Sequence, residues 1–346
     1  MKGSSIMQEG RYIYGIIKTD KEKSFGPCGI NTDEKVYTIS HQDIACVVSK
    51  SPVQDYSSML KETLGHYLVK HQTIIEKIMR EYTIIPMKFG TFAFNDDEAI
   101  EVLKRGYCQF KELLINMDGK IELDVAATYN DLDSIIKEIA DVDEGIREFK
   151  AEIAKRPSSQ TLQDRIKIGM MIKEALSKRR EKEQSHIIEF LKGVAVDFQK
   201  HQVMDDKMIL NCAFLLEKSK EINFDAALKE LNQEYKEKVN FRCVGPLPPY
   251  SFATCQLKKI GYSQIDEAKR LLGLRENTSL EEIKESYRQL AQRNHPDKRP
   301  ENSELKEGFE KVTSAYKLLS SCCQGETINF KDNRQRDFIV VEIIRP

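Results

Sequence analysis

RYIYGIIK, residues 11–18, is an aromatic and β-branched run, and a turn cluster of glycine and proline follows at residues 26–29. Such runs form β-strands, because branched and aromatic side chains pack well on a pleated surface. Residues 36–39 and 44–49 have the same character and are separated by a short polar segment, which predicts a hairpin. The chain therefore begins as a β-sheet.

Helical patterns then alternate with further strands up to residue 130. In residues 57–82 the apolar positions recur at spacings of four and three, as on one buried face of a helix: Leu64, Leu68, His71, Ile75, Ile78 and Tyr82. A strand is predicted around Pro86, Asn95 caps a second helix over residues 96–116, and residues 121–129 form a closing strand. We therefore predict for residues 1–130 an α+β domain of the ferredoxin-like kind, with helices on one face of a mostly antiparallel sheet.

Residues 131–257 predict a second α+β domain with a long helical arm. Residues 132–202 are heavily charged and are interrupted at Pro157, and this pattern favours a hairpin of two helices. Its apolar positions have nearly heptad spacing: Ile135, Ile139, Val142, Ile146, Phe149 and Ile153. Strand, helix, strand and strand are then predicted at residues 209–216, 225–237, 239–244 and 250–255.

The sequence pattern of residues 258–325 predicts an all-α module of three helices, at residues 265–272, 280–293 and 304–320. Ser279 and Glu282 form a capping box, which marks the start of the middle helix. Residues 326–346 are a polar linker that ends in an apolar strand, FIVVEII, at residues 338–344.

The composition narrows the classes of function. The 346 residues include 54 lysines and arginines against 55 acidic residues, so the net charge of −1 does not favour nucleic acid as a partner. The eight cysteines form no C-x-x-C pair, which suits reduced thiols in a cytoplasm. Because no run approaches the roughly 18 apolar residues of a membrane span, we expect a soluble, cytoplasmic protein.

A polar loop follows the middle helix of the third module. His295, Pro296 and Asp297 lie there, and because proline cannot continue a helix, the imidazole and the carboxylate are presented at a rigid corner. The preceding helix adds cations at Lys284, Arg288 and Arg293, which we place on a face left free by the core. This arrangement predicts a surface that recognises another protein.

In helix order, loop and spacing, residues 262–321 resemble the J domain of DnaJ-type co-chaperones. The resemblance implies that His295, Pro296 and Asp297 stimulate ATP hydrolysis by a DnaK-type chaperone, which would dock against the helix carrying Lys284, Arg288 and Arg293. The chain departs from that family after residue 321, where Cys322, Cys323, Gln324 and Gly325 replace the usual turn into a basic fourth helix.

Three further blocks carry a second resemblance. They are RYIYGI at residues 11–16, IIPMKFGTF at residues 84–92 and GPLPPYSF at residues 245–252. In order and separation they resemble the GvpF/GvpL family of gas vesicle accessory proteins. The motif residues are Pro86, Phe89, Gly90, Gly245, Pro246, Pro248, Pro249, Tyr250 and Phe252.

The two resemblances together imply a gas vesicle assembly factor. Its partners would be the shell protein GvpA, other Gvp proteins and a DnaK-type chaperone ATPase, and it would be cytoplasmic and associated with gas vesicles. Two alternatives stay open: a minor structural or nucleating component of the shell with a non-functional J-like spacer, and a general DnaJ-like co-chaperone.

Enzymatic chemistry has no motif to support it in this chain. Neither a phosphate-binding glycine loop nor a serine nucleophile elbow is present. His66 and His71 lie five residues apart on different helical faces, which argues against a metal site. We therefore expect a protein without catalytic residues, metal or cofactor.

Overall fold

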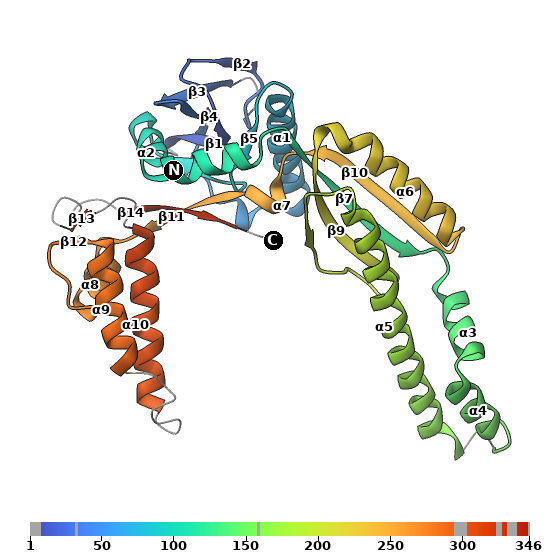
Figure 1. The fold of residues 1–346 in the computed structure, drawn as a ribbon. Helices are drawn as coiled ribbons and strands as arrows, with labels where there is room; N and C mark the ends of the chain where they lie inside the picture. The colour runs from blue at the N-terminus through green and yellow to red at the C-terminus, as the bar shows by residue number, and fades with distance from the viewer. Residues whose placement is uncertain are drawn as a thin grey trace, which may run out of the picture. The chain divides into compact units, whose positions relative to one another are not determined.

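The computed structural model describes residues 8–31, 34–157, 160–293, 303–322, 327–330 and 338–344. These residues form two compact units. The first unit joins the N-terminal part, up to Asn116, to Ala253–Ile344, and the second unit is Met117–Phe252. The three-helix module therefore belongs to the same unit as the N-terminal sheet (Figure 1).

An antiparallel sheet forms the centre of the first unit. Its strands are β1 (Glu9–Ile17), β2 (Ser24–Pro27), β3 (Lys35–His41), β4 (Ile44–Pro52), β5 (Ile84–Pro86) and β6 (Phe92–Ala93). Their order is β2-β3-β4-β1-β5, and β6 also pairs with β1. The predicted strands around residues 11–18, 36–39, 44–49 and Pro86 are all confirmed.

Two helices, α1 (Lys61–Met79) and α2 (Asp96–Asn116), cover this sheet. Ser49 of β4 bonds Tyr14, whose ring stacks on His71 of α1, whereas the Cys46 thiol reaches the Ala99 carbonyl of α2. Since positions three apart on a strand point to opposite faces, α1 and α2 lie on opposite faces of the sheet. The α+β class is confirmed, but the placement of both helices on one face is wrong.

Only the C-terminal half of α1 packs as its periodicity predicts. His71, Ile75 and Ile78 are buried, but Leu68 is 43% exposed. A short 3₁₀ helix, η1 (Tyr56–Ser58), precedes α1. The N-terminal half of α1 thus leaves an apolar side chain uncovered.

The second unit is built on a four-stranded sheet of order β10-β7-β9-β8. Its strands are β7 (Lys120–Tyr129), β8 (Asp197–Lys200), β9 (Met208–Glu217) and β10 (Val239–Leu247). The prediction that residues 121–129 close the first domain is wrong, because β7 pairs along its length with β9 and β10. Local patterns identify a strand but not the distant partner that it pairs with.

The described residues of the helical arm form the helices α3 (Leu132–Val142), α4 (Glu144–Ile153) and α5 (Leu162–Lys192) (Figure 1). The predicted first helix is split at Asp143, whose backbone is extended and whose carboxylate accepts the Ile146 N–H at 3.0 Å. A further 3₁₀ turn, η3 (Lys218–Lys220), leads into α6 (Glu221–Tyr235). The helix predicted at residues 225–237 is thereby confirmed.

The strand predicted at residues 250–255 is wrong in its first half. Residues Tyr250–Ala253 form a short helix, α7, and the strand begins later as β11 (Cys255–Ile260). The Ser251 N–H donates to Glu122 at 2.8 Å, which holds the chain in a turn after the prolines.

The three predicted C-terminal helices are confirmed as α8 (Tyr262–Leu271), α9 (Leu280–Arg293) and α10 (Ser303–Cys322). The module is not entirely helical, because β12 (Asn277–Ser279) pairs with β13 (Thr327–Asn329). The predicted C-terminal strand is β14 (Phe338–Ile343), and it pairs antiparallel with β11. The domain boundary predicted near Lys258 therefore lies within a strand.

Candidate functional site

Helices α9 and α10 pack against each other through apolar side chains. Ile283, Val312 and Leu319 are buried in their shared core, and the rings of Tyr287 and Tyr316 stack with centroids 4.3 Å apart. The capping box is formed, because the Ser279 N–H donates to Glu282 at 2.7 Å and the Glu282 N–H donates back at 3.1 Å. The first residue of α9 and its orientation about the helix axis are therefore well defined.

The rotation of α9 divides the three predicted cations between two sides of the helix. Lys284 and Arg288 are exposed and one turn apart, so they share a face. Arg293 lies nine residues beyond Lys284, which is half a turn away, and it lines a groove against the α8–α9 loop with Glu282. The predicted cationic face thus consists of Lys284 and Arg288 without Arg293.

The predicted chaperone-binding tripeptide, His295, Pro296 and Asp297, lies outside the described residues. Its position relative to Lys284 and Arg288 therefore stays a prediction.

Strands complete the core of the helical module. Phe338 and Val340 of β14 are buried with Ile265 of α8 and Ile283 of α9. Ile328 and Phe330 join the same core from the segment around β13. These side chains supply apolar surface after α10, where the J-domain family continues into a fourth helix.

The first two motif blocks meet in the first unit. The Tyr12 hydroxyl accepts the Gly90 N–H at 3.1 Å and lies 2.9 Å from Nδ1 of His71. Burial lowers the pKa of His71 to about 4, so the ring is neutral at pH 7. Gly90 has a φ of +81°, a conformation that disfavours side chains. Phe89 packs on Tyr56 with ring centroids 4.6 Å apart.

This second block lines a groove of about 750 Å³, which we call the motif groove. Its walls come from η1, the start of α1, the β5–β6 loop and β11. Phe94, which is 45% exposed, and Leu257 contribute apolar surface. Pro86 itself is buried in β5. The residues that line the groove include Tyr56, Leu64, Phe89, Phe94, Leu257 and Lys259.

Strand β11 ties the motif groove to the helical module. The Lys88 N–H donates to the Cys255 carbonyl at 2.7 Å, directly after β5. Farther along β11, the Lys259 ammonium lies 2.5 Å from Glu98 and 3.8 Å from the Phe94 ring centroid. Since β11 continues into α8 one residue later, the groove borders the root of the helical module.

The third motif block lies in the second unit. Gly245, with a φ of +149°, runs so close to β7 that a Cβ would meet the Leu123 side chain at 2.4 Å. Pro246 lies in β10 at the edge of the sheet, where a strand tolerates a missing donor. Pro248 and Pro249 lead into α7, which contains Tyr250 and Phe252.

Sequence reasoning missed the residue that anchors this block. Glu122 of β7 is 1% exposed and accepts hydrogen bonds at 2.8 Å from both the N–H and the hydroxyl of Ser251. Nε2 of His201 lies 3.1 Å from the same hydroxyl. The pKa of Glu122 is raised to about 8, chiefly by burial and in smaller part by the neighbouring Asp124. The signal in the sequence is the pair of acids in an otherwise apolar strand.

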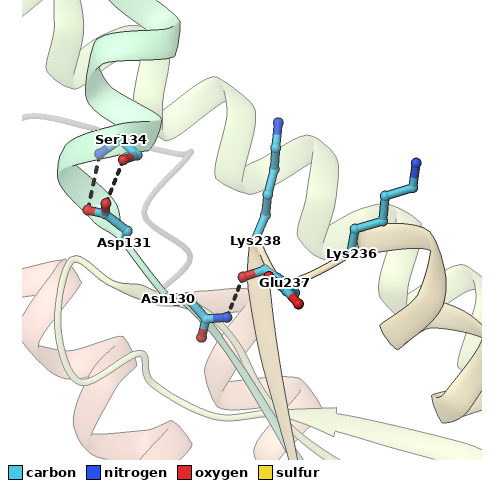
Figure 2. Close-up of a pocket in the computed structure, with 6 residues that line it drawn as sticks. All are labelled: Asn130, Asp131, Ser134, Lys236, Glu237 and Lys238. Carbon is cyan, nitrogen blue, oxygen red and sulfur yellow. Dashed lines mark hydrogen bonds between the residues drawn. The ribbon is translucent and has the colours of Figure 1, made fainter.

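Figure 2 shows a hollow at the base of the arm, lined by Asn130, Asp131, Ser134, Lys236, Glu237 and Lys238. Its polar groups serve the fold. Asp131 caps α3 by accepting from Ser134, the Asn130 amide donates to the Glu237 carbonyl, and Lys238 pairs with Glu138 at 3.0 Å. We therefore assign no ligand to it.

Two features are missing from the part of the chain that the structure describes. No cluster of three or more metal-ligating side chains occurs there, and His71 lies in the aromatic core. Among the same residues, no helix has the length and apolarity to cross a bilayer.

Comparison with known families finds two matches. The family model described as gas vesicle synthesis protein GvpL/GvpF matches residues 10–254, and the DnaJ domain model matches residues 270–324. Gas vesicle protein F of a Streptomyces strain is 25% identical over 244 residues, which cover 70% of this chain and 98% of the relative. Gas vesicle protein F1 of Halobacterium salinarum is 23% identical over 71% of this chain and 93% of its own length. Chaperone protein DnaJ of a Wolbachia strain is 47% identical over 51 residues, 15% of this chain and 14% of that protein.

Solved structures agree on the fold. The crystal structure of GvpF from Anabaena matches with a TM-score of 0.62 at 21% identity and covers 71% of this chain and 98% of that one. GvpF from Microcystis aeruginosa matches with a TM-score of 0.56 at 20% identity, over 70% and 98% of the two chains.

Proposed function

The chain belongs to the gas vesicle GvpL/GvpF family and carries a C-terminal DnaJ domain, and from this premise we propose that it is a gas vesicle assembly factor. Its family region would bind the shell protein GvpA, and its J domain would recruit a DnaK-type chaperone. The observation that carries the proposal is the presence of both on one chain, with β11 in contact with the motif block of one and continuous with the helices of the other.

Physical chemistry explains why shell-protein binding and chaperone recruitment would be joined on one chain. A protein that assembles into a shell through apolar surfaces exposes them beforehand and tends to aggregate. A chaperone recruited beside such a subunit would hold it until delivery. We place this action in the cytoplasm, where DnaK-type ATPases work.

The motif groove is the shell-protein site that the geometry supports best. It is apolar at Phe94 and Leu257, open to solvent, and lined by the second family block. Burying one phenylalanine ring contributes about 1.5–3 kcal/mol. A partner that covers Phe94 would lose about tenfold to a hundredfold in affinity when that ring is removed.

Binding to purified GvpA tests this half of the proposal. Phe94→Ser should weaken the affinity by about tenfold or more, because the groove loses an exposed ring. Ile222→Ser is the matched control, since Ile222 is 81% exposed on α6 and does not line the motif groove. If the unmodified chain does not bind GvpA, the shell-protein role fails.

ATP hydrolysis by DnaK tests the other half. The full chain should accelerate hydrolysis, and His295→Gln should abolish the acceleration without changing GvpA binding. An equal acceleration by the variant would contradict the chaperone role. Co-purification with washed vesicles without any effect on the ATPase would favour a minor shell component instead.

A further inference from the structure

The distal half of α5 carries a row of apolar side chains that the described part of the second unit leaves uncovered. Leu162, Ile166 and Met170 recur every four residues, and they are 69%, 56% and 60% exposed. Gly169 lies among them, and a Cβ built there would meet nothing within 4 Å. We call Leu162, Ile166 and Met170 the arm stripe. It spans about 12 Å along the helix axis.

The arm does not need this stripe for its own packing. Helices α3 and α4 pack on α5, and Figure 1 shows α5 running beside them. Ile168 and Ile172 of α5 are less exposed than the stripe, and helix geometry places them on the other side. The distal half of α5 therefore has two apolar faces, of which one is occupied. The buried residues of the arm include Ile139, Ile146, Ile153 and Leu176.

Basic side chains lie around the free face. Arg165 and Lys167 lie about 100° to either side of Ile166, and Lys173 lies within about 20° of Ile166, so it continues the row one turn beyond Met170. The Lys167 ammonium also lies over the Phe149 ring, 4.8 Å from its centroid, a contact that leaves its charge without an anion.

No described acid of the arm forms an ion pair with these cations. Within the described residues none of the three cations has a carboxylate partner. Two acids of the same stretch are paired with other cations, because Asp164 bonds Arg156 at 3.0 Å and Glu174 bonds Lys178 at 2.8 Å. The stripe is thus an apolar strip with uncompensated positive edges.

This charge pattern selects among the conceivable occupants. A second copy of the chain would bring three cations against three cations, which is unfavourable. An anionic bilayer favours a broad apolar face with aromatic side chains, whereas this face is a single column without an aromatic residue. A helix with apolar residues at spacings of three and four can interdigitate with such a column. Its acidic edges would pair with Arg165 and Lys167, and an acid at the end of its apolar row would pair with Lys173.

We infer that the arm stripe is a docking surface for an amphipathic helix of a partner protein, with an apolar row and acidic edges. The surface shares no residue with the motif groove or the J domain, so it adds a third interaction to this chain.

A pair of synthetic helical peptides tests the inference on the full chain. Both carry leucines at spacings of three and four, and their flanking positions are glutamate in one and lysine in the other. We expect the glutamate peptide to bind at least tenfold more tightly than the lysine peptide. Ile166→Glu should weaken that binding at least tenfold, whereas Ile222→Glu, an exposed isoleucine on α6, should leave it unchanged.

A charge-reversal variant distinguishes charge-specific recognition from nonspecific apolar binding. Lys173→Glu keeps the apolar row, so it should weaken binding of the glutamate peptide and strengthen binding of the lysine peptide. Lys229→Glu on α6 should change the affinity of neither peptide. Circular dichroism before binding checks that each variant keeps its helices. Equal binding of both peptides, or unchanged binding by Ile166→Glu, would overturn the inference. The inference would also be overturned if the unmodified chain dimerised, or bound anionic vesicles, and Ile166→Glu abolished that dimerisation or binding.

Discussion

Glu122 shows how a single buried carboxyl group ties a motif to the fold. In the folded protein its pKa is raised to about 8, mainly by burial, whereas in the unfolded chain it should be near the ordinary value of about 4.3. Between these values the folded state holds the proton more tightly than the unfolded state. Its stabilising contribution is therefore complete at low pH and is lost as the pH rises through 8.

We predict that the free energy of unfolding falls between pH 5 and pH 8, with a contribution from this group of at most about 1.4 kcal/mol per pH unit. Glu122→Gln, which cannot ionise, should remove that part of the slope. Urea unfolding at several pH values measures it. Glu189→Gln, at an exposed position on α5, should keep the slope of the unmodified protein. An unchanged slope in Glu122→Gln would contradict the assignment.

Gly90 supports a second prediction at this scale. Its φ of +81° opposes a side chain, and so does the Tyr56 ring, which would lie 3.3 Å from an added Cβ. Gly90→Ala should destabilise the protein by about 1–2 kcal/mol, as the midpoint of urea unfolding would show. Gly65→Ala is the control, because Gly65 is helical and a Cβ there meets nothing within 4 Å. It should stabilise α1 by up to about 1 kcal/mol.

The residues that sequence alone can identify are those with a local signature. Gly90 and the prolines of the third block are recognisable because backbone restriction is visible in the residue type. Glu122 stands out locally as one of two acids in an otherwise apolar strand, but its role is not visible, since its partner Ser251 is 129 positions away in the chain. Arg293, the last residue of α9, follows Lys284 by nine residues, which is two and a half helical turns. It therefore lies on the opposite side of α9 from Lys284 and Arg288.

At the scale of elements, β14 is the part that the helical module depends on. Phe338 is 1% exposed, lies in the module core and has the Arg105 guanidinium 5.5 Å from its ring centroid. Phe338→Ala should therefore cost about 3–5 kcal/mol and loosen α9 and α10. Amide hydrogen exchange in those helices measures this. Ile343→Ala, at a 41% exposed position of the same strand, should leave their exchange nearly unchanged.

Elements are predictable where their pattern is local. The sequence patterns of α2, α9 and α10 and the aromatic and β-branched runs of β1 and β4 predict the right types and nearly the right bounds. Pairing partners are not predictable in this way, because β7 and β14 pair with strands far away in the chain: Thr128 lies opposite Met208, and Phe338 lies opposite Ile260. The break at Asp143 depends on one capping carboxylate inside a continuous helical pattern.

For the whole molecule, the proposed function requires both activities on one chain. A linked pair of sites has an effective concentration on the order of millimolar, far above that of two separate proteins in a cell. Phe94→Ser should impair binding of the shell protein, and His295→Gln should impair recruitment of the chaperone. Each variant should therefore support fewer gas vesicles.

Co-expression of the two variants tests whether both activities must lie on one chain. Because neither chain carries both functions, co-expressing them should not restore vesicle content, measured as pressure-sensitive turbidity. Co-expression of Ile222→Ser with His295→Gln should restore it, since the former keeps both sites. Full recovery with the two defective chains would mean that the activities need not be joined, and the tethering proposal would fail.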